Sequence, residues 1–343
     1  ETTVSSGSTV EVGKTKTLTV TDRFAVPLGD TNSRDNTPEA GTTRFNQDFG
    51  TLEFFDGVNW KTVNSYARYH GGSAGRAVVA GGDRGPASSR LIDYFNMNTR
   101  GNSINFGDLV NLTNNQTGAN SSSTRGLIYI GNAENTIEYV TIASSGNAIE
   151  FGSTAVNDRE QVTDGCSSST RGLFGGGLDN PVVQDIIEYN EISTLGNALD
   201  FGDLSVARFS VSAFQSPTRG YFANGYNNQT DVTYNVVDTV KFASLGDAID
   251  FGDTTRAGRG SGACSNHTRG VVFAGNLHPN SFKDICITTM ASGGSFVDFG
   301  FLSTNKNNVS GASSHTRGFC IGGDSTNIIE SILFSSSGGV TDF

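Results

Sequence analysis

The chain has 343 residues, a formal net charge of −11, 35% hydrophobic residues and only 17% charged residues. The excess of acidic residues argues against a nucleic-acid-binding surface, which needs a basic patch, and equally against docking on an anionic membrane. No apolar run approaches the ~18 residues that a membrane-spanning helix requires, so we expect no membrane insertion.

Residues 1–37 are polar and carry two short alternating segments. Val10 to Val12 and Leu18 to Val20 place apolar residues at every second position, as short strands do. A segment this small cannot build a core of its own. We therefore expect a β-rich stalk or attachment segment, which is either flexible or buries its few apolar positions against copies of itself or a partner.

Residues 38–63 predict a small module built on a β-hairpin. The expected strands are Gly41 to Phe45 and Thr51 to Phe55, and the dipeptide Asp56-Gly57 after the second strand is a strong turn signal. Trp60 follows this turn and is the only tryptophan of the chain. Its large apolar ring is expected to fill the core of this module or a subunit interface rather than to bind sugar.

Residues 64–343 repeat one pattern six times at steps of about 48 residues, which is close to the kelch period of about 50. In the fourth copy four β-type segments are expected, at 209–214, 220–224, 233–243 and 248–252. A phenylalanine closes each copy: Phe106, Phe151, Phe201, Phe251, Phe299 and Phe343. Since propellers have about four to eight blades, the repeats predict an all-β chain whose main domain is a six-bladed, kelch-like β-propeller.

One arginine recurs in every copy: Arg76, Arg125, Arg171, Arg219, Arg269 and Arg317. It could bind an anion as a ring of guanidinium groups. It could instead be a structural fork that is satisfied by backbone carbonyls or by the acid before the closing phenylalanine. That acid is present in five copies: Glu150, Asp200, Asp250, Asp298 and Asp342. We favour the structural role, because a ligand site usually breaks the symmetry of a repeat.

The segment between the second and third strands differs most among the copies. Its polar residues are the candidate binding residues, on loops that should leave one face of the disk: Tyr226, Asn227, Asn228, Gln229, His278 and Asn280. These side chains suit a weak polar ligand such as a surface glycan. An ordinary solvated loop face explains them equally well.

The sequence predicts no enzyme, metal site or cofactor. His267 and His315 occupy equivalent repeat positions, and no metal-binding or nucleophile motif accompanies them. The Phe-Gly-Asp turns at Asp108, Asp203 and Asp253 lack the dense acids of a calcium loop. The four cysteines have no CxxC spacing and are expected to be free thiols in packed positions: Cys166, Cys264, Cys286 and Cys320.

Two stretches resemble a known family. Pro38, Gly41, Arg44, Asn46, Leu52, Glu53, Gly57 and Trp60 hold the pattern P-x-x-G-x-x-R-x-N followed by L-E-x-x-x-G-x-x-W. This pattern is similar to a short module of tailed-bacteriophage fibre and appendage proteins. The repeats, as in TRGLFGGG and GNALDFGDL, resemble those of structural proteins from marine and cyanobacterial phages.

The resemblance implies a virion protein, and the low cysteine content indicates assembly in the reducing cytoplasm of the host. The resemblance further implies a homotrimer formed through the N-terminal part, with residues 38–63 as a trimerisation-like module and other virion proteins as partners. The propeller of such a fibre or spike would contact a host-surface glycan or protein. The alternatives are a purely structural head fibre, collar or tail adaptor and, third, a propeller enzyme that degrades polysaccharide.

Overall fold

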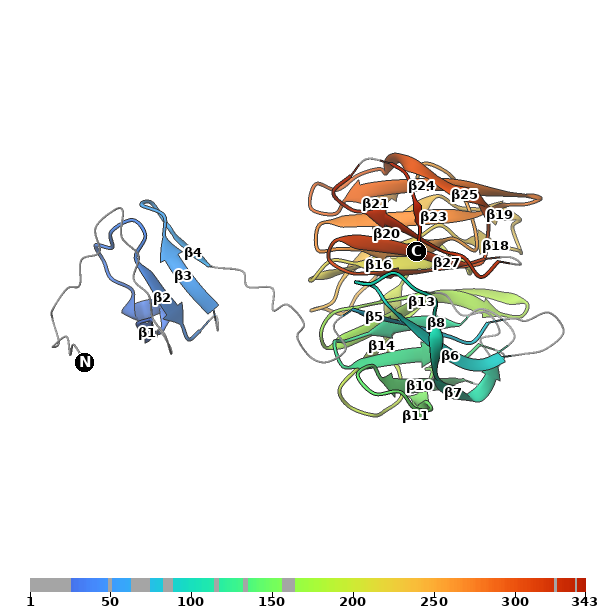
Figure 1. Cartoon of the computed structure of the whole chain (residues 1–343), viewed down its shortest axis with the longest axis horizontal. Coiled ribbons are helices and arrows are strands. Elements are labelled where there is room, and N and C mark those ends of the chain that lie inside the picture. Colours follow the sequence, from blue (N-terminus) through green and yellow to red (C-terminus); the bar gives the residue numbers. More distant parts are fainter. Residues whose placement is uncertain are drawn as a thin grey trace. The chain divides into compact units, whose positions relative to one another are not determined.

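The computed structural model describes residues 26–48, 51–62, 75–82, 89–113, 117–131, 135–155, 164–323, 326–336 and 338–343. The chain divides into two compact units, Glu1–Arg68 and Tyr69–Phe343, and Figure 1 labels many of their strands. In the described ranges the regular structure is β throughout, apart from a three-residue 3-10 turn at Thr31–Ser33. None of these ranges contains a helix with the length and hydrophobicity needed to span a membrane.

The first unit is one four-stranded sheet. It contains β1 (Leu28–Gly29), β2 (Thr43–Asn46), β3 (Thr51–Phe55) and β4 (Trp60–Thr62) in that order. Strands β2 and β3 form the expected antiparallel hairpin. The carboxylate of Asp56 accepts the amides of Val58 and Asn59 at 2.8 and 2.7 Å, so the turn forms where the sequence predicts it. Strand β1 pairs in parallel with β2, so the folded sheet begins upstream of the boundary expected at residue 38.

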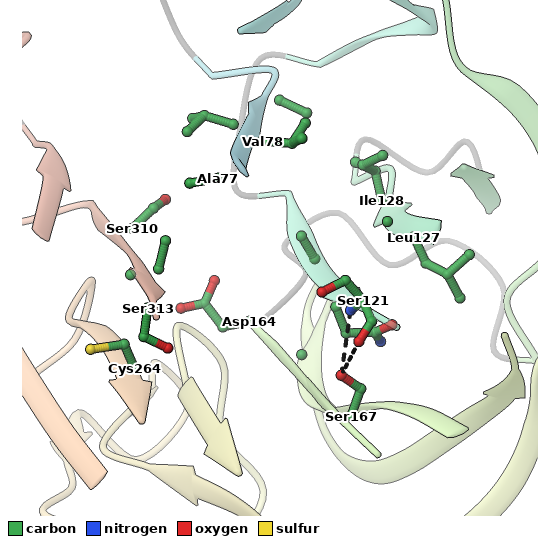
Figure 2. A pocket seen from close by; sticks show the side chains of 18 of the residues that line it. Ala77, Val78, Ser121, Leu127, Ile128, Asp164, Ser167, Cys264, Ser310 and Ser313 are labelled. Atoms are coloured by element: carbon green, nitrogen blue, oxygen red, sulfur yellow. Dashed lines mark hydrogen bonds between the residues drawn. The ribbon is translucent and has the colours of Figure 1, made fainter. Parts of the chain in front are cut away.

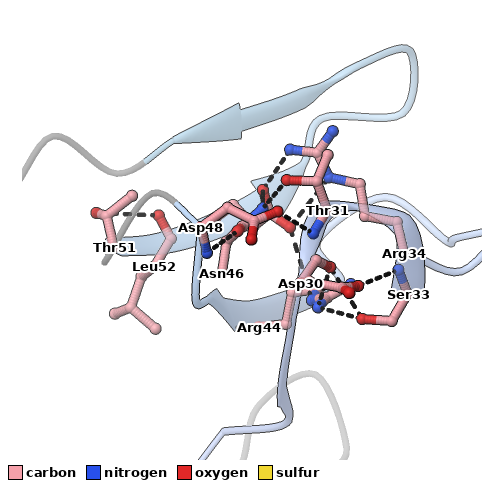
Figure 3. A network of polar contacts seen from close by, with 10 residues as sticks. Asp30, Thr31, Ser33, Arg34, Arg44, Asn46, Asp48, Thr51 and Leu52 are labelled. Atoms are coloured by element: carbon pink, nitrogen blue, oxygen red, sulfur yellow. Dashed lines mark hydrogen bonds and ion pairs between the residues drawn. The ribbon is translucent and has the colours of Figure 1, made fainter.

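A network of polar side chains fills the interior of this unit (Figure 3). Glu53 is fully buried and accepts two hydrogen bonds from the guanidinium of Arg34, at 3.1 and 2.6 Å. The amide of Asn46 donates to the same carboxylate at 3.0 Å, and Arg44 lies 3.6 Å from it. Arg44, Asn46 and Glu53 are three residues of the N-terminal pattern, so the pattern encodes this network. Trp60 is only half-buried, and its ring lies tilted against that of Phe55, with ring centroids 5.7 Å apart.

The second unit consists of successive antiparallel sheets, numbered here in chain order. Sheet 1 contains β5 (Arg76–Ala80), β6 (Ser89–Asn96) and β7 (Ile104–Thr113). Sheet 2 contains β8 (Gly118–Ser121), β9 (Arg125–Tyr129), β10 (Thr136–Thr141) and β11 (Ile149–Ser153). Sheet 3 contains β12 (Gly165–Ser167), β13 (Arg171–Asp179), β14 (Val182–Glu191) and β15 (Leu199–Asp203).

Sheet 4 contains β16 (Ser212–Gln215), β17 (Arg219–Ala223), β20 (Val236–Lys241) and β21 (Ile249–Asp253), with a small pair β18 (Tyr226–Asn227) and β19 (Val232–Thr233) beside it. Sheet 5 contains β22 (Gly262–Ser265), β23 (Arg269–Leu277), β24 (Asn280–Thr289) and β25 (Val297–Lys306). Sheet 6 contains β26 (Val309–Ser313), β27 (Arg317–Gly322), β28 (Ile329–Leu333) and β29 (Thr341–Asp342). The four strands of sheet 4 lie close to the segments expected for the fourth copy.

The core of the second unit lies between neighbouring sheets. Phe106 of sheet 1 packs with Ile128 and Val140 of sheet 2, and equivalent clusters join the later sheets. The first and last sheets also meet, because the ring of Phe95 lies 5.4 Å from that of Phe319 and 5.6 Å from that of Phe343. Each sheet therefore buries its apolar faces against its neighbours, as repeat units must.

A close backbone contact explains why a glycine follows the closing phenylalanine in the first five copies. The amide of Gly196 in sheet 3 donates to the carbonyl of Phe151 in sheet 2 at 3.1 Å. The backbones approach so closely that a Cβ on Gly152 would lie 2.3 Å from the oxygen of Gly196. The same hydrogen bond joins the last sheet to the first, from the amide of Gly101 to the carbonyl of Phe343 at 3.3 Å.

Candidate functional site

The recurring arginines begin the second strand of sheets 2 to 6 and the first strand of sheet 1, and four of them link neighbouring sheets. The Nη1 of Arg125 donates to the carbonyl of Ile192 at 3.0 Å, and that of Arg171 donates to Phe242 at 2.8 Å. Arg76 donates to Ile142 in the same way, and Arg269 to Phe334. In all four cases the carbonyl belongs to the next sheet along the chain, which is the backbone-carbonyl alternative of the structural interpretation.

The acids before the closing phenylalanines are not the partners of these four arginines. All five are exposed: Glu150, Asp200, Asp250, Asp298 and Asp342. Among the described residues, one recurring arginine forms an ion pair: Arg171 lies 2.7 Å from Glu191, which is not one of these five acids. The expected arginine–acid pairing is thus wrong for the arginines whose contacts are seen. Three of them instead lie over a tyrosine of their own sheet, 4.6–4.9 Å from the ring centre: Arg76 over Tyr94, Arg125 over Tyr139 and Arg171 over Tyr189.

A second acid also recurs, on the third strand of the sheets, and the sequence analysis did not recognise its role. Glu138 accepts the amides of Val110 and Asn111 of the preceding sheet at 2.8 and 2.9 Å. Glu188 accepts the hydroxyl of Tyr129, also in the preceding sheet, at 2.6 Å. The signal was present in the sequence, because an acid recurs between β-forming residues in Ile-Glu-Tyr. Such a pattern usually indicates an exposed strand face, but these carboxylates are fully buried.

In two sheets the buried acid also has a buried cation. Asp238 lies 3.0 Å from Arg208, and both side chains are fully buried. Glu330 lies 2.6 Å from Lys306, with both side chains at most 2% exposed. Burial lowers the pKa of Arg208, and the charge of Asp238 opposes this effect. For Glu330 burial raises the pKa, but hydrogen bonds from Lys306 and Ser303 outweigh it and hold the pKa below its usual value.

Serine hydroxyls tie the first strands together around the centre of the unit. The Oγ of Ser167 donates to the carbonyl of Ser121 at 2.7 Å (Figure 2). Ser265 donates to Gln215 at 2.6 Å, and Ser313 to Ser265 at 2.7 Å. A cavity of about 260 Å³ lies beside these strands, and burial raises the pKa of Asp164 in its wall to about 7. The polar side chains that recur between copies thus hold the sheets together, so a ligand site should use residues that depart from the repeat.

Sheet 5 departs most clearly from the repeat. Gly258 stands where the neighbouring copies have Arg208 and Lys306, and Cys286 stands where they have Asp238 and Glu330. The ring of Phe282 occupies the space beside Gly258, because a Cβ on that glycine would lie 2.7 Å from it. Arg256 covers this ring at 4.4 Å and pairs with Asp284 at 2.9 Å. The buried ion pair of the neighbouring sheets is therefore replaced by a partly exposed arginine at the surface.

Arg259 is the second departure and was not anticipated from the sequence. It stands where the fourth copy has Phe209. Its guanidinium lies 4.3 Å from the ring centre of Tyr226, and its backbone pairs with Asn276 at 3.0 and 2.9 Å. The hydroxyl of Tyr226 donates to Asp231 at 2.9 Å, and this hydrogen bond is the main cause of the raised pKa of Tyr226. A cation, an aromatic ring and a carboxylate thus meet at the junction of sheets 4 and 5.

The candidate binding residues lie in strands and turns around this junction. Asn227 belongs to β18 and is only 7% exposed; its side chain donates to Ala207 and accepts two turn amides, so it stabilises the turn. Asn228 and Gln229 are exposed in that turn. His278 and Asn280 are exposed at the tip of the hairpin formed by β23 and β24. Arg259 connects the two sets, since it contacts Tyr226 and pairs with β23.

The variable segments of the third and fifth copies are not loops, contrary to expectation. Strands β13 and β14 continue as a hairpin in which Asp179 pairs with Val182, and Leu277 pairs with Asn280 in the same way. The segment of the first copy, residues 83–88, lies outside the described residues. We call the surface formed by Tyr226, Asn228, Gln229, Asp231, Arg256, Arg259, His278 and Asn280 the junction surface.

The histidines and cysteines outside this surface have structural surroundings. The rings of His267 and His315 stack with centroids 4.6 Å apart, and burial together with His315 lowers the pKa of His267. All four cysteines are free and buried. Burial raises the pKa of Cys286 to about 11 and that of Cys320 to about 12. In the part of the chain that the structure describes, no three His, Cys, Asp or Glu residues come together as metal ligands.

No family model and no curated protein matches the chain. Solved structures do resemble it. The structure of YjhT matches with a TM-score of 0.58 and 9% identity, covering 76% of this chain and 98% of that chain. At this identity the likeness shows the fold alone. Together with the successive antiparallel sheets it is consistent with an all-β, β-propeller-like fold.

Proposed function

We propose that the second unit is a closed six-bladed β-propeller in which each numbered sheet is one blade. The contact between Gly101 and Phe343 supports this, because it repeats between the last and first sheets the hydrogen bond that joins consecutive sheets. The aromatic contacts of Phe95 with Phe319 and Phe343 support it as well. The six repeats would then form one ring with no open end.

On this scaffold the chain acts as a subunit of a tailed-phage appendage, a fibre or spike, and its propeller contacts the host surface. The N-terminal part assembles the subunits, as a homotrimer and with other virion proteins. The phage assignment rests on the resemblance of residues 38–63 and of the repeats, and it places the protein in the virion. No enzymatic step, metal or cofactor belongs to this proposal.

The observation that carries host contact is the distribution of polar side chains in the second unit. Recurring arginines, acids and serines hold sheets together, whereas the junction surface departs from the repeat and presents exposed polar groups. Tyr226 and Arg259 offer an aromatic ring and a planar donor, and Asn228, Gln229 and Asn280 offer amides. This combination is suited to a sugar, which presents hydroxyl groups around an apolar ring face.

Binding of the full chain to an array of bacterial surface glycans tests this function. The wild type should bind saturably, and Arg259→Ala should weaken binding at least tenfold, about 1.4 kcal/mol. The double substitution Asn228→Ala and Gln229→Ala should also weaken it, and it changes only exposed side chains. Arg100→Ala is the matched control, an exposed arginine outside the junction surface.

The alternative is a purely structural virion part, such as a head fibre, collar or tail adaptor. The ring of inter-sheet contacts suits a rigid spacer equally well. This alternative predicts no saturable binding to host glycans or to host cells. Equal binding by the wild type and both junction-surface variants would show that the junction surface is not the binding site. It would not affect the proposal of a propeller fold.

A further inference from the structure

A pocket of about 320 Å³ lies at one end of sheet 1, and two arginines line it. Arg76 begins β5, and Arg100 lies in the turn between β6 and β7. Asn96, Thr99 and Asn102 add polar groups, and no acid lines the pocket among the described residues. Pockets of this size bind small molecules through a few well-placed polar groups.

The guanidinium of Arg76 is fixed in place with one edge free. Its Nη1 donates to the carbonyls of Ile142 and Ala143 at 3.1 and 3.0 Å, and it lies 4.6 Å from the ring centre of Tyr94. In the part of the chain that the structure describes, its Nε and Nη2 donate to no group. Two carbonyls and a ring therefore orient the guanidinium while its other donors remain available.

Sheet 3 shows what the equivalent edge of the arginine binds. Arg76 is paired with Asn96 across β5 and β6, and Arg171 is paired in the same way with Glu191 across β13 and β14. The Nε of Arg171 donates to the carboxylate of Glu191 at 2.7 Å. Because neutral Asn96 takes the place of Glu191 in sheet 1, the donors that hold a carboxylate of the chain itself in sheet 3 are open to an external acceptor there.

Two further replacements make the same end of sheet 1 more positive. Arg100 stands where the third copy has Leu195, and Asn105 stands where it has Asp200. Arg100 is exposed, and no acid among the described residues pairs with it. The chain as a whole carries a net charge of −11, so this local excess of positive charge is not a general property of its surface.

We propose that this pocket binds a small oxyanion, a carboxylate or phosphate group, between Arg76 and Arg100. Arginine donors bind both groups through short, charge-assisted hydrogen bonds. Ile104 also lines the pocket and is 56% exposed, so an anion carried by a sugar ring gains an apolar contact that a free anion lacks. We call this site the arginine pocket; its lining consists of Arg76, Tyr94, Phe95, Asn96, Thr99, Arg100, Gly101, Asn102 and Ile104.

The inference goes beyond the proposed function. The arginine pocket belongs to sheet 1, whereas the junction surface lies where sheets 4 and 5 meet. It depends neither on the phage assignment nor on the closure of the ring, because every contact that carries it lies in sheets 1 to 3.

Calorimetric titration of the full chain with glucuronic acid and, separately, with inorganic phosphate tests the proposal. Saturable binding of at least one anion is expected at low ionic strength, where exposed charges are least screened. Tighter binding of glucuronic acid would identify a sugar-borne carboxylate as the ligand, and tighter binding of phosphate would identify a phosphate group. Binding of neither anion at up to about 10 mM, or equal binding of neutral glucose, would overturn the proposal.

Three variants with the same change in net charge locate the site. Arg100→Gln should weaken anion binding at least about tenfold. Asn96→Glu should do the same, because it gives Arg76 the internal carboxylate that its counterpart in sheet 3 has. Arg90→Gln is the matched control, an exposed arginine of β6 outside the pocket, and should stay within about twofold of the wild type. All three positions are exposed or outside the core, and equal binding by the three variants would mean that the arginine pocket is not the site.

The same titrations distinguish this site from the junction surface. Arg259→Ala should leave anion binding in the arginine pocket unchanged, and Arg100→Gln should leave the binding of neutral glycans unchanged. Anion binding without any glycan binding would remove only the host-contact function. Loss of anion binding in Arg259→Ala but not in Arg100→Gln would place the anion on the junction surface, and the inference would be wrong.

Discussion

The two units bury opposite kinds of side chain. The second unit buries phenylalanine, isoleucine and leucine between sheets, so each sheet is stabilised by residues of the same chain. The first unit buries Arg44, Asn46 and Glu53 and leaves Leu28 and Phe45 in solvent. The described residues of the second unit thus bury their apolar side chains within the chain, whereas those of the first unit leave apolar side chains exposed on one side of a sheet.

Both units nevertheless contain a buried carboxylate with a cation. In the first unit Glu53 is bound by Arg34, which is 26% exposed and so remains partly hydrated. In the second unit Asp238 and Arg208 are both fully buried, so neither charge is hydrated. A buried charge without a partner is costly. Removing one partner of the ion pair should therefore lower the stability much more in the second unit than in the first.

The largest expected effect is in the second unit. Asp238→Ala leaves Arg208 buried without its carboxylate and should lower the free energy of unfolding by about 3–5 kcal/mol. Replacing Arg208 by methionine in the same chain should recover part of this loss, because the unpaired charge is then gone. Urea unfolding followed by far-UV circular dichroism measures both. If the double variant is no more stable than Asp238→Ala, the charge is not the cause.

Much of this architecture could be predicted from the sequence. The six repeats, their four β segments and the hairpin of the N-terminal module follow from periodicity and from the Asp56-Gly57 turn, both of which are local signals. The burial of Cys166 and Cys264 follows from their equivalent positions, five residues before the recurring arginine. Strand β1 could not be foreseen, because it has only two residues and pairs with a strand fourteen or more positions away.

The contacts between sheets were harder to predict than the sheets themselves. The recurring arginine was recognised, but the backbone carbonyls that it binds lie 65 or more residues away along the chain, in the next sheet. The repeat therefore suggested the wrong partner, since Asp200 recurs with Arg171 and lies much nearer to it in sequence than the carbonyl of Phe242 does. Arg259 was missed because it occupies the connection before a first strand, where no repeat signal marks it. Tyr226 was named as a candidate because the variable segments were compared copy by copy.

A loss of stability of intermediate size should follow from adding a side chain where the backbones of two sheets approach closely. Gly152→Ala places a Cβ against the backbone oxygen of Gly196, which cannot move without shifting the next sheet. We expect a loss of about 1–3 kcal/mol in the free energy of unfolding of the second unit, as for other overpacked sites. Gly146→Ala is the matched control, because nothing lies within 4 Å of its Cβ position, and it should stay within about 0.5 kcal/mol of the wild type. Equal losses in the two variants would contradict the close approach.

The smallest expected effect is a change in acid stability that separates the two units. The hydrogen bond from Arg34 is the main cause of the lowered pKa of Glu53, against the opposing effect of burial. Because the folded pKa lies below the unfolded value of about 4.3, the stabilisation is complete above that pH and is lost as the pH falls through the folded pKa. The Glu53→Gln variant lacks this carboxylate. Its first unit should therefore be less stable than the wild type at pH 7, and it should lose less stability between pH 5 and pH 2. Trp60 fluorescence measures this for the first unit alone, while circular dichroism follows the second unit, whose Glu330 is unchanged. An identical acid transition of Trp60 in both proteins would mean that Glu53 does not hold the first unit together.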